Sequence, residues 1–171
     1  QQFRVTKNRL QVEAYTRTSD GKRFESLGIT LKPRNPVPRG YWLLIEQSPS
    51  FMQVVARAPT WLEDQRQAYG GYREVKVRPW NRDKNWTGKG LVVDLLGTWG
   101  LVTHTSAAAV TALIVGVPII VGQEHALYGP FWGPGEPLDE DRRVEMLSVL
   151  ADNQFTVEDL KNGKAWAWLN S

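Results

Sequence analysis

The chain has 171 residues, and 21 lysines and arginines against 18 aspartates and glutamates give it a formal net charge of +3. This length fits one domain of about 150 residues with room for a short appendage. A hydrophobic fraction of 42% is ordinary for a folded domain and argues against disorder. The absence of cysteine excludes a disulfide scaffold, a zinc ribbon, an iron–sulfur centre and thiol catalysis, and with only two histidines we expect no metal site.

The charge is distributed unevenly along the chain. Residues 1–39 hold nine lysines and arginines against three acidic residues, residues 66–89 hold seven against two, and residues 136–171 hold four against eight. No charged side chain lies between Asp94 and Glu124, but glycines and a proline interrupt this stretch, so an apolar helix of about 20 residues cannot be drawn through it. Because no signal peptide is recognisable either, we expect a cytoplasmic protein without a transmembrane segment.

The chain opens with residues 1–39, which we expect to be an extended, linker-like segment because closely spaced prolines disfavour helix. Beyond it, short apolar or alternating runs predict strands, and capping residues, glycines and prolines bound the helices. In chain order we predict a strand at 41–45, a helix at 60–70, a strand at 74–78, a short helix at 90–97, a strand at 99–103, a helix at 106–115, a strand at 118–121, and helices at 139–151 and 156–162.

Several residues predict how these helices begin and end. Thr60 with Glu63, and Thr156 with Asp159, have the spacing of a capping box. Gly116 stands where the end of a helix favours a left-handed residue. The alternation of strands and helices predicts an α/β fold of the Rossmann-like, three-layer αβα kind, with a mainly parallel sheet of at least four strands and C-terminal helices. In such a sheet the ligand lies beyond the carboxyl ends of the strands.

The loop after the third predicted strand carries the most polar chemistry. It contains three hydroxyl residues and a histidine and leads into a helix that begins with small residues; these positions are Thr103, His104, Thr105, Ser106 and Ala107. Backbone N–H groups at a helix start favour a phosphate, and the hydroxyls add donors. The alternative is that Ser106 only caps the helix and that His104 only bonds within the loop.

Two other strand ends supply charged or polar groups. Arg78 ends the second strand with a fixed positive charge that suits phosphate oxygens, although a plain surface arginine is the alternative. Glu124 and His125 follow the fourth strand, where a carboxylate could bind sugar hydroxyls or simply be solvated. No P-loop, glycine-rich dinucleotide fingerprint or nucleophile elbow is present, which argues against a P-loop NTPase, an NAD enzyme and an α/β-hydrolase.

Residues 102–109 followed by 112–121 resemble the donor-binding motif of GT-B type glycosyltransferases, closest to capsular-polysaccharide-type and phage-encoded glycosyltransferase-like proteins. The tail at 150–166 and the segment 27–33 resemble the same proteins, so the likeness spans roughly 24–169. It implies the C-terminal, donor-binding half of a two-domain enzyme of a bacterial or phage-infected cell. Residues 1–39 would be the remnant of a preceding domain, and residues 40–171 the nucleotide-sugar-binding domain.

The resemblance implies transfer of a sugar from a nucleotide diphosphate, with a UDP-sugar as the first expectation and no tightly bound cofactor. The acceptor would be a polysaccharide, a lipid-linked molecule or a nucleic acid. The phosphates would contact Arg78, Thr105 and Ser106, with Thr103, His104 and Ala107 nearby, while Gln47, Ser48, Thr111, Glu124 and His125 would line the cleft or reach the sugar. Thr111 replaces a glutamate that holds the ribose in many relatives. The catalytic base is expected in the missing half, so no catalytic residue is assigned.

Two other functions fit the sequence. A sugar-nucleotide epimerase shares the two-half fold, and product analysis would separate it from a transferase. A non-catalytic nucleic-acid-associated module would use the basic stretch 66–89, where Trp80 and Trp86 could stack on bases.

Overall fold

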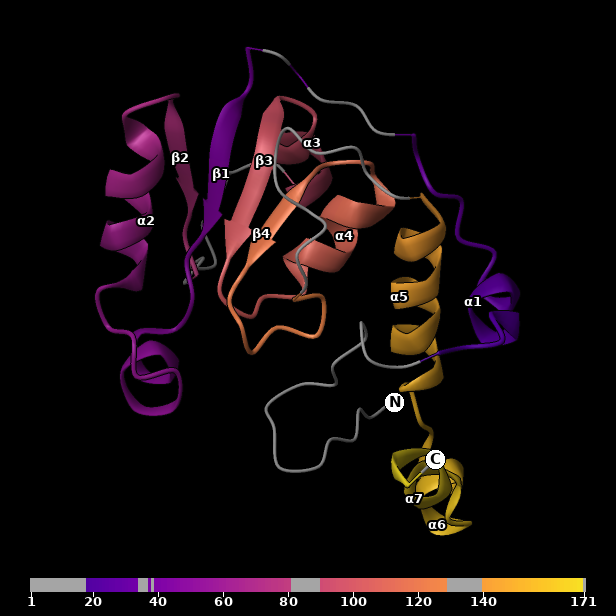
Figure 1. Ribbon diagram of the computed structural model, residues 1–171. Coiled ribbons are helices and arrows are strands. Elements are labelled where there is room, and N and C mark those ends of the chain that lie inside the picture. The colour runs from indigo at the N-terminus through magenta and orange to yellow at the C-terminus, as the bar shows by residue number, and fades with distance from the viewer. Residues whose placement is uncertain (1–17, 34–36, 38, 81–89, 129–139, 171) are drawn as a thin grey trace.

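Four parallel strands form the sheet at the centre of the computed structural model (Figure 1). The model describes residues 18–33, 37, 39–80, 90–128 and 140–170. The strands are β1 (Tyr41–Ile45), β2 (Val75–Arg78), β3 (Thr98–Thr103) and β4 (Ile119–Val121), in the spatial order β2-β1-β3-β4. All four coincide with the predicted strands to within a residue, and the Rossmann-like α/β fold predicted from the sequence is confirmed.

Helices surround this sheet and complete the chain. They are α1 (Lys22–Ser26), α2 (Trp61–Gly70), α3 (Leu91–Leu95), α4 (Ala108–Ile114), α5 (Glu140–Asp152), α6 (Val157–Lys161) and α7 (Lys164–Leu169), with a π-helical turn η2 (Phe51–Val55) before α2. The sequence did not predict α1, η2 or α7. Helices of five or six residues are marginal on local propensity alone, and these three lack the capping pattern that marks the equally short α6.

Each face of the sheet buries a separate hydrophobic cluster. On one face, Trp42, Leu44 and Val102 pack beneath α2, which contributes Trp61 and Leu62. On the other face, the larger cluster joins alternate residues of the same strands to α4 and α5. Figure 1 shows α2 on one side of the strands and α4 and α5 on the other. The result is three layers, helix–sheet–helix.

The described part of the opening segment packs onto the larger cluster. Phe24 of α1 is buried against α5, and the Lys32 N–H donates to the Ile114 carbonyl at 2.8 Å. Arg143 of α5, whose side chain is fully buried, donates to the Lys32 and Ile114 carbonyls at 2.8 and 3.1 Å. Residues 18–33 thus contain a helix that packs against α5, which differs from the extended segment predicted for 1–39.

The predicted helix ends agree with the structure at two positions and fail at a third. The Thr156 backbone and hydroxyl donate to Asp159 at 3.0 and 2.8 Å, and these bonds together with Lys164 lower the pKa of Asp159 to about 2. Gly116 has a left-handed φ of 81°. The capping box predicted at Thr60 does not form, because its hydroxyl donates instead to Asp64 at 2.9 Å.

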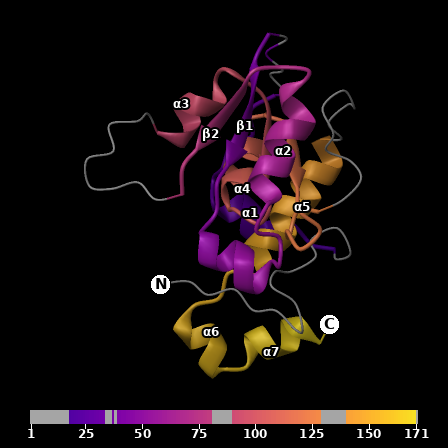
Figure 2. The same cartoon turned by 90° about the vertical axis from the view of Figure 1, so that its left-hand side faces the viewer.

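The helices α6 and α7 form a pair at the end of the chain, set apart from the sheet (Figure 2). The pair is held to the preceding residues by an edge-on contact between the rings of Phe155 and Trp168, whose centroids are 5.9 Å apart. Along the described parts of the chain, no helix is long and apolar enough to cross a membrane.

Candidate functional site

The strand order places a topological switch point between β1 and β3. From β1 the chain passes through α2 on one face to reach β2, whereas from β3 it passes through α4 on the other face to reach β4. The loops that follow β1 and β3 therefore diverge toward opposite faces of the sheet, at the point where these adjacent strands end. In open parallel sheets this divergence creates the crevice in which ligands bind.

A side-chain bridge joins these two loops. The amide oxygen of Gln47, which follows β1, accepts hydrogen bonds from both the N–H and the hydroxyl of Thr105, each at 2.9 Å. Because a backbone N–H can only donate, Oε1 must be the atom that faces Thr105. The Gln47 Nε2 group is therefore turned away, and within the described residues it forms no hydrogen bond.

Ser106 continues this polar loop and is held by three hydrogen bonds. Its N–H donates to the Thr103 hydroxyl at 3.3 Å, its own Oγ accepts from the Ala108 N–H at 3.2 Å, and its carbonyl is 3.0 Å from Nε2 of His125. In this arrangement the Ser106 hydroxyl oxygen acts as an acceptor and its proton is left to donate elsewhere. Gln47 and Ser106 together offer fixed, uncharged donors at the switch point.

His125 lies beneath this loop rather than in the cleft. Its side chain is 3% exposed, and its Nδ1 accepts a hydrogen bond from the Leu127 N–H at 2.9 Å. With Nδ1 as an acceptor, Nε2 carries the proton that is donated to the Ser106 carbonyl. His125 therefore positions the β3–α4 loop, in contrast to the cleft-lining role expected from the sequence.

His104 is nearly buried at the end of β3. The rings of Trp61 and Phe51 stand edge-on to it, with centroids 5.8 and 6.4 Å away, and its Nδ1 has no hydrogen-bond partner. Burial lowers the pKa of His104, and Glu124 partly opposes this shift. A side chain at Gly122 would come within 3.1 Å of the imidazole, so the β4 loop must pass close to it. The imidazole is thus favoured in its neutral form.

Arg78 does not extend beyond the strand ends as the sequence suggested. Its side chain is 6% exposed and forms an ion pair with Asp94 of α3. The Asp94 carbonyl in turn accepts from the hydroxyls of Tyr41 and Thr98, at the first residues of β1 and β3. The guanidinium is therefore turned back along the sheet face toward α3, away from the predicted phosphate site.

The remaining predicted site residues have separate positions. Ser48 accepts from the Phe51 N–H at 3.3 Å and so starts η2. Ala107 is the residue before α4, and Thr111 is half-buried within that helix. Glu124 is exposed in the loop after β4.

The described part of the basic stretch 66–89 makes local contacts. The Arg73 guanidinium lies 4.1 Å from the ring centre of Trp99, and the Lys76 ammonium lies 3.9 Å from that of Tyr41. Trp80 is 53% exposed, while Trp86 lies outside the described residues.

Sequence reasoning missed the aromatic part of this site. Trp61 lies in the predicted helix 60–70 and Phe51 follows the predicted strand 41–45, and neither is among the predicted site residues, yet both border His104. Glu46 was also missed, and its carboxylate accepts from the Trp80 N–H at 3.0 Å, which ties the end of β1 to the end of β2. Glu46 and Phe51 lie in the loop 46–51 after the first strand, where the fold type predicts ligand-binding residues, but their individual contacts join distant parts of the chain and have no local signal.

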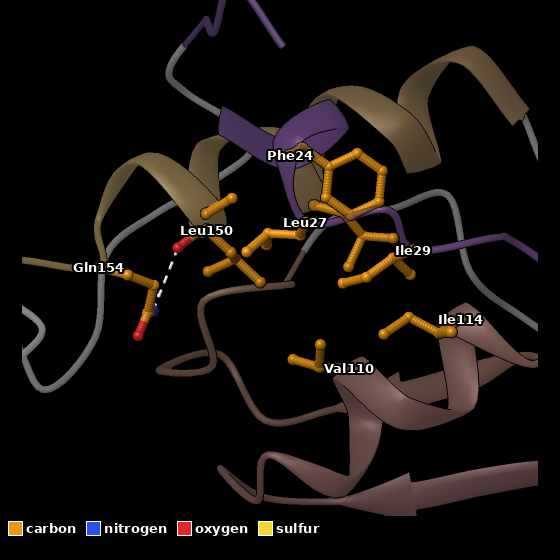
Figure 3. A pocket seen from close by; sticks show the side chains of 9 residues that line it. Phe24, Leu27, Ile29, Val110, Ile114, Leu150 and Gln154 are labelled. Atoms are coloured by element: carbon orange, nitrogen blue, oxygen red, sulfur yellow. Dashed lines mark hydrogen bonds between the residues drawn. The ribbon is translucent and has the colours of Figure 1, made fainter. Parts of the chain in front are cut away.

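A hollow lies between α1, α4 and α5 (Figure 3). It has a volume of about 190 Å³, and apart from Gln154 its lining is apolar, including Phe24, Leu27, Ile29, Val110, Ile114 and Leu150. The Gln154 amide donates to the Leu150 carbonyl at 3.2 Å. Such a lining cannot orient a nucleotide, so the polar loops that diverge at the switch point are the candidate functional site.

Among the described residues, no group of three or more metal-ligating side chains is present. Comparisons of the chain with models of protein families, with curated proteins and with solved structures found no match.

Proposed function

We propose that this chain is a nucleotide-sugar-binding domain of the glycosyltransferase type and that its ligand binds at the switch point between β1 and β3. The observation that carries the proposal is the Gln47–Thr105 bridge, which joins the two polar loops that diverge at the switch point, where parallel α/β sheets bind ligands. The resemblance of residues 102–121 to a glycosyltransferase donor-binding motif supports the same choice of ligand.

The chemistry of the crevice suits a sugar or nucleoside portion of such a ligand. Amide and hydroxyl donors on Gln47 and Ser106 can bond to hydroxyl and carbonyl oxygens, and the rings of Phe51 and Trp61 pack against the neighbouring His104. The neutral His104 adds no charge to this surface.

Sugar transfer would break the bond between the anomeric carbon and the diphosphate, leaving negative charge on the departing nucleotide. Fixed donors that face this charge stabilise the transition state because they need no reorganisation as the charge develops. The acceptor would be a polysaccharide, a lipid-linked molecule or a nucleic acid, and a second domain would supply it. A UDP-sugar is the first donor to test.

The test is a thermal-shift screen of the whole chain against UDP, ADP, GDP, dTDP and their sugar conjugates. A ligand at 100 times its Kd stabilises the folded state by about 2.7 kcal/mol, or about 5–11 °C in Tm for a chain of this size. Gln47→Met should reduce the shift, because it removes both the donors and the bridge. Gln154→Met, in the apolar hollow, is the matched control and should leave the shift intact.

Absence of a shift with every nucleotide and nucleotide sugar would refute the proposal. A new nucleotide sugar formed without any acceptor would instead identify an epimerase. Retention on DNA that survives moderate salt, with no nucleotide-sugar binding, would favour the nucleic-acid module.

A further inference from the structure

Arg57 has an unusual backbone conformation in the loop between η2 and α2. Its φ is 53°, and it is the one non-glycine residue with positive φ in the described parts of the chain. The other residues there with positive φ are glycines. For an L-residue with a side chain, this left-handed region costs about 1–2 kcal/mol relative to the right-handed one.

The surrounding loop imposes this conformation. The Ala56 N–H donates to the Phe51 carbonyl at 3.0 Å, and the Ala58 N–H donates to the Met52 carbonyl at 2.8 Å, so the residues on both sides of Arg57 are tied back to η2. Glycine would adopt the same conformation without steric cost. An arginine here therefore has an unfavourable backbone conformation. Its side chain is exposed and, within the described structure, forms no ion pair or hydrogen bond that would offset this cost.

The loop that carries Arg57 borders the candidate site. It begins at Phe51 and ends at Trp61, and the rings of both residues stand edge-on to His104 at the end of β3. In Figure 1 the purple coil of η2, which precedes α2, lies at the same end of the molecule as the ends of the strands. Arg57 is thus an exposed cation in a loop whose two end residues both contact His104, at the end of β3.

A nucleotide diphosphate needs a cationic partner that Arg78 does not provide, because Arg78 is buried and paired with Asp94. We infer that Arg57 binds the diphosphate of the nucleotide ligand, an inference that rests on the function proposed above. The planar guanidinium can donate two parallel hydrogen bonds to phosphate oxygens, which gives both strength and orientation. Backbone strain at such a position is typical of ligand-binding sites.

The experiment measures the affinities of UDP and uridine for the whole chain by titration calorimetry, with another diphosphate and its nucleoside used in their place if the screen selects them. The variants are Arg57→Gly and Arg57→Gln. Losing a charge-assisted hydrogen bond should weaken UDP binding about 10- to 100-fold, while uridine binding stays unchanged. Arg57→Gly should also unfold at the same temperature as the wild type or higher, because it relieves the left-handed backbone.

Arg66→Gln is the matched control. Arg66 is an exposed arginine of α2 whose guanidinium lies 3.8 Å from the Glu63 carboxylate. The Arg66→Gln variant should bind UDP as tightly as the wild type does. If the Arg57 variants bind UDP as tightly as the wild type does, the inference about Arg57 is wrong and the proposed function stands. An equal loss of UDP and uridine affinity would also overturn it, because the arginine would then act on the loop and not on the phosphates. If the wild type binds no nucleotide, the proposed function fails and this inference fails with it.

Discussion

The buried ion pair between Arg78 and Asp94 gives the sharpest test of how this fold is stabilised. Arg78 was expected to contact a ligand, but its 6% exposed side chain lies against the Asp94 carboxylate, which is itself 25% exposed. We predict that Asp94→Ala strongly destabilises the folded chain. The substitution leaves a guanidinium that is always charged in a site from which water is largely excluded.

Removing one partner of a buried ion pair costs about 3–5 kcal/mol, whereas an exposed pair contributes about 0–1 kcal/mol. Because a quarter of Asp94 is open to solvent, water can enter the vacated space. We therefore expect the lower end, about 3 kcal/mol, which corresponds to a fall in Tm of about 6–12 °C.

The measurement is urea unfolding followed by tryptophan fluorescence, for which the chain carries eight tryptophans. The midpoint should fall while the slope of the free energy against urea stays constant. The double variant Arg78→Met with Asp94→Leu should recover most of the loss, because it replaces the buried charges with apolar groups of similar length. A cost below about 1 kcal/mol for Asp94→Ala would refute the reasoning, because it would mean that water solvates Arg78 as at a surface.

Two further predictions concern the backbone and the pH dependence. Gly116→Ala should destabilise the chain much more than Gly28→Ala. Both glycines have positive φ, 81° and 62°, so the backbone strain is similar. At position 116, however, the added Cβ would lie 2.2 Å from the Pro33 carbonyl oxygen, whereas at position 28 it would lie in open space. Thermal unfolding of the two variants measures the difference, and equal losses would contradict the steric argument. Burial lowers the pKa of His104, so the unfolded chain takes up a proton first as the pH falls. The free energy of unfolding should therefore be constant above the unfolded pKa of about 6.5 and decrease below it by at most about 1.4 kcal/mol per pH unit. Urea titrations between pH 8 and 5 measure this free energy of unfolding, and its decrease at low pH should be smaller in His104→Gln than in the wild type. The same pH dependence in both proteins would show that other groups cause the decrease.

The sequence by itself determined the four strands, the α-helices between them and the type of fold. Continuous apolar runs such as Tyr41–Ile45 can only be buried on both faces, which predicts the strands of a parallel sheet covered by helices. Thr156 with Asp159, and Gly116 with its left-handed φ, act within one turn of chain, so their effects follow directly from residue spacing. The fold type also predicted that the polar loops lie together at one edge of the sheet, because all parallel strands end on the same side.

Only the tertiary structure decided what each polar side chain on that edge does. Arg78 forms an ion pair with Asp94, which lies 16 residues away in the sequence, and is therefore not directed to the loops. His125 is buried beneath Ser106, 19 residues away. Gln47 meets Thr105 across 58 residues. A charge or an imidazole has the same chemistry wherever it occurs, but its burial and its partners come from strands that are adjacent in space and distant in sequence. For that reason the sequence could predict that polar loops meet at this edge of the sheet, but it could not predict which of their side chains are buried or paired.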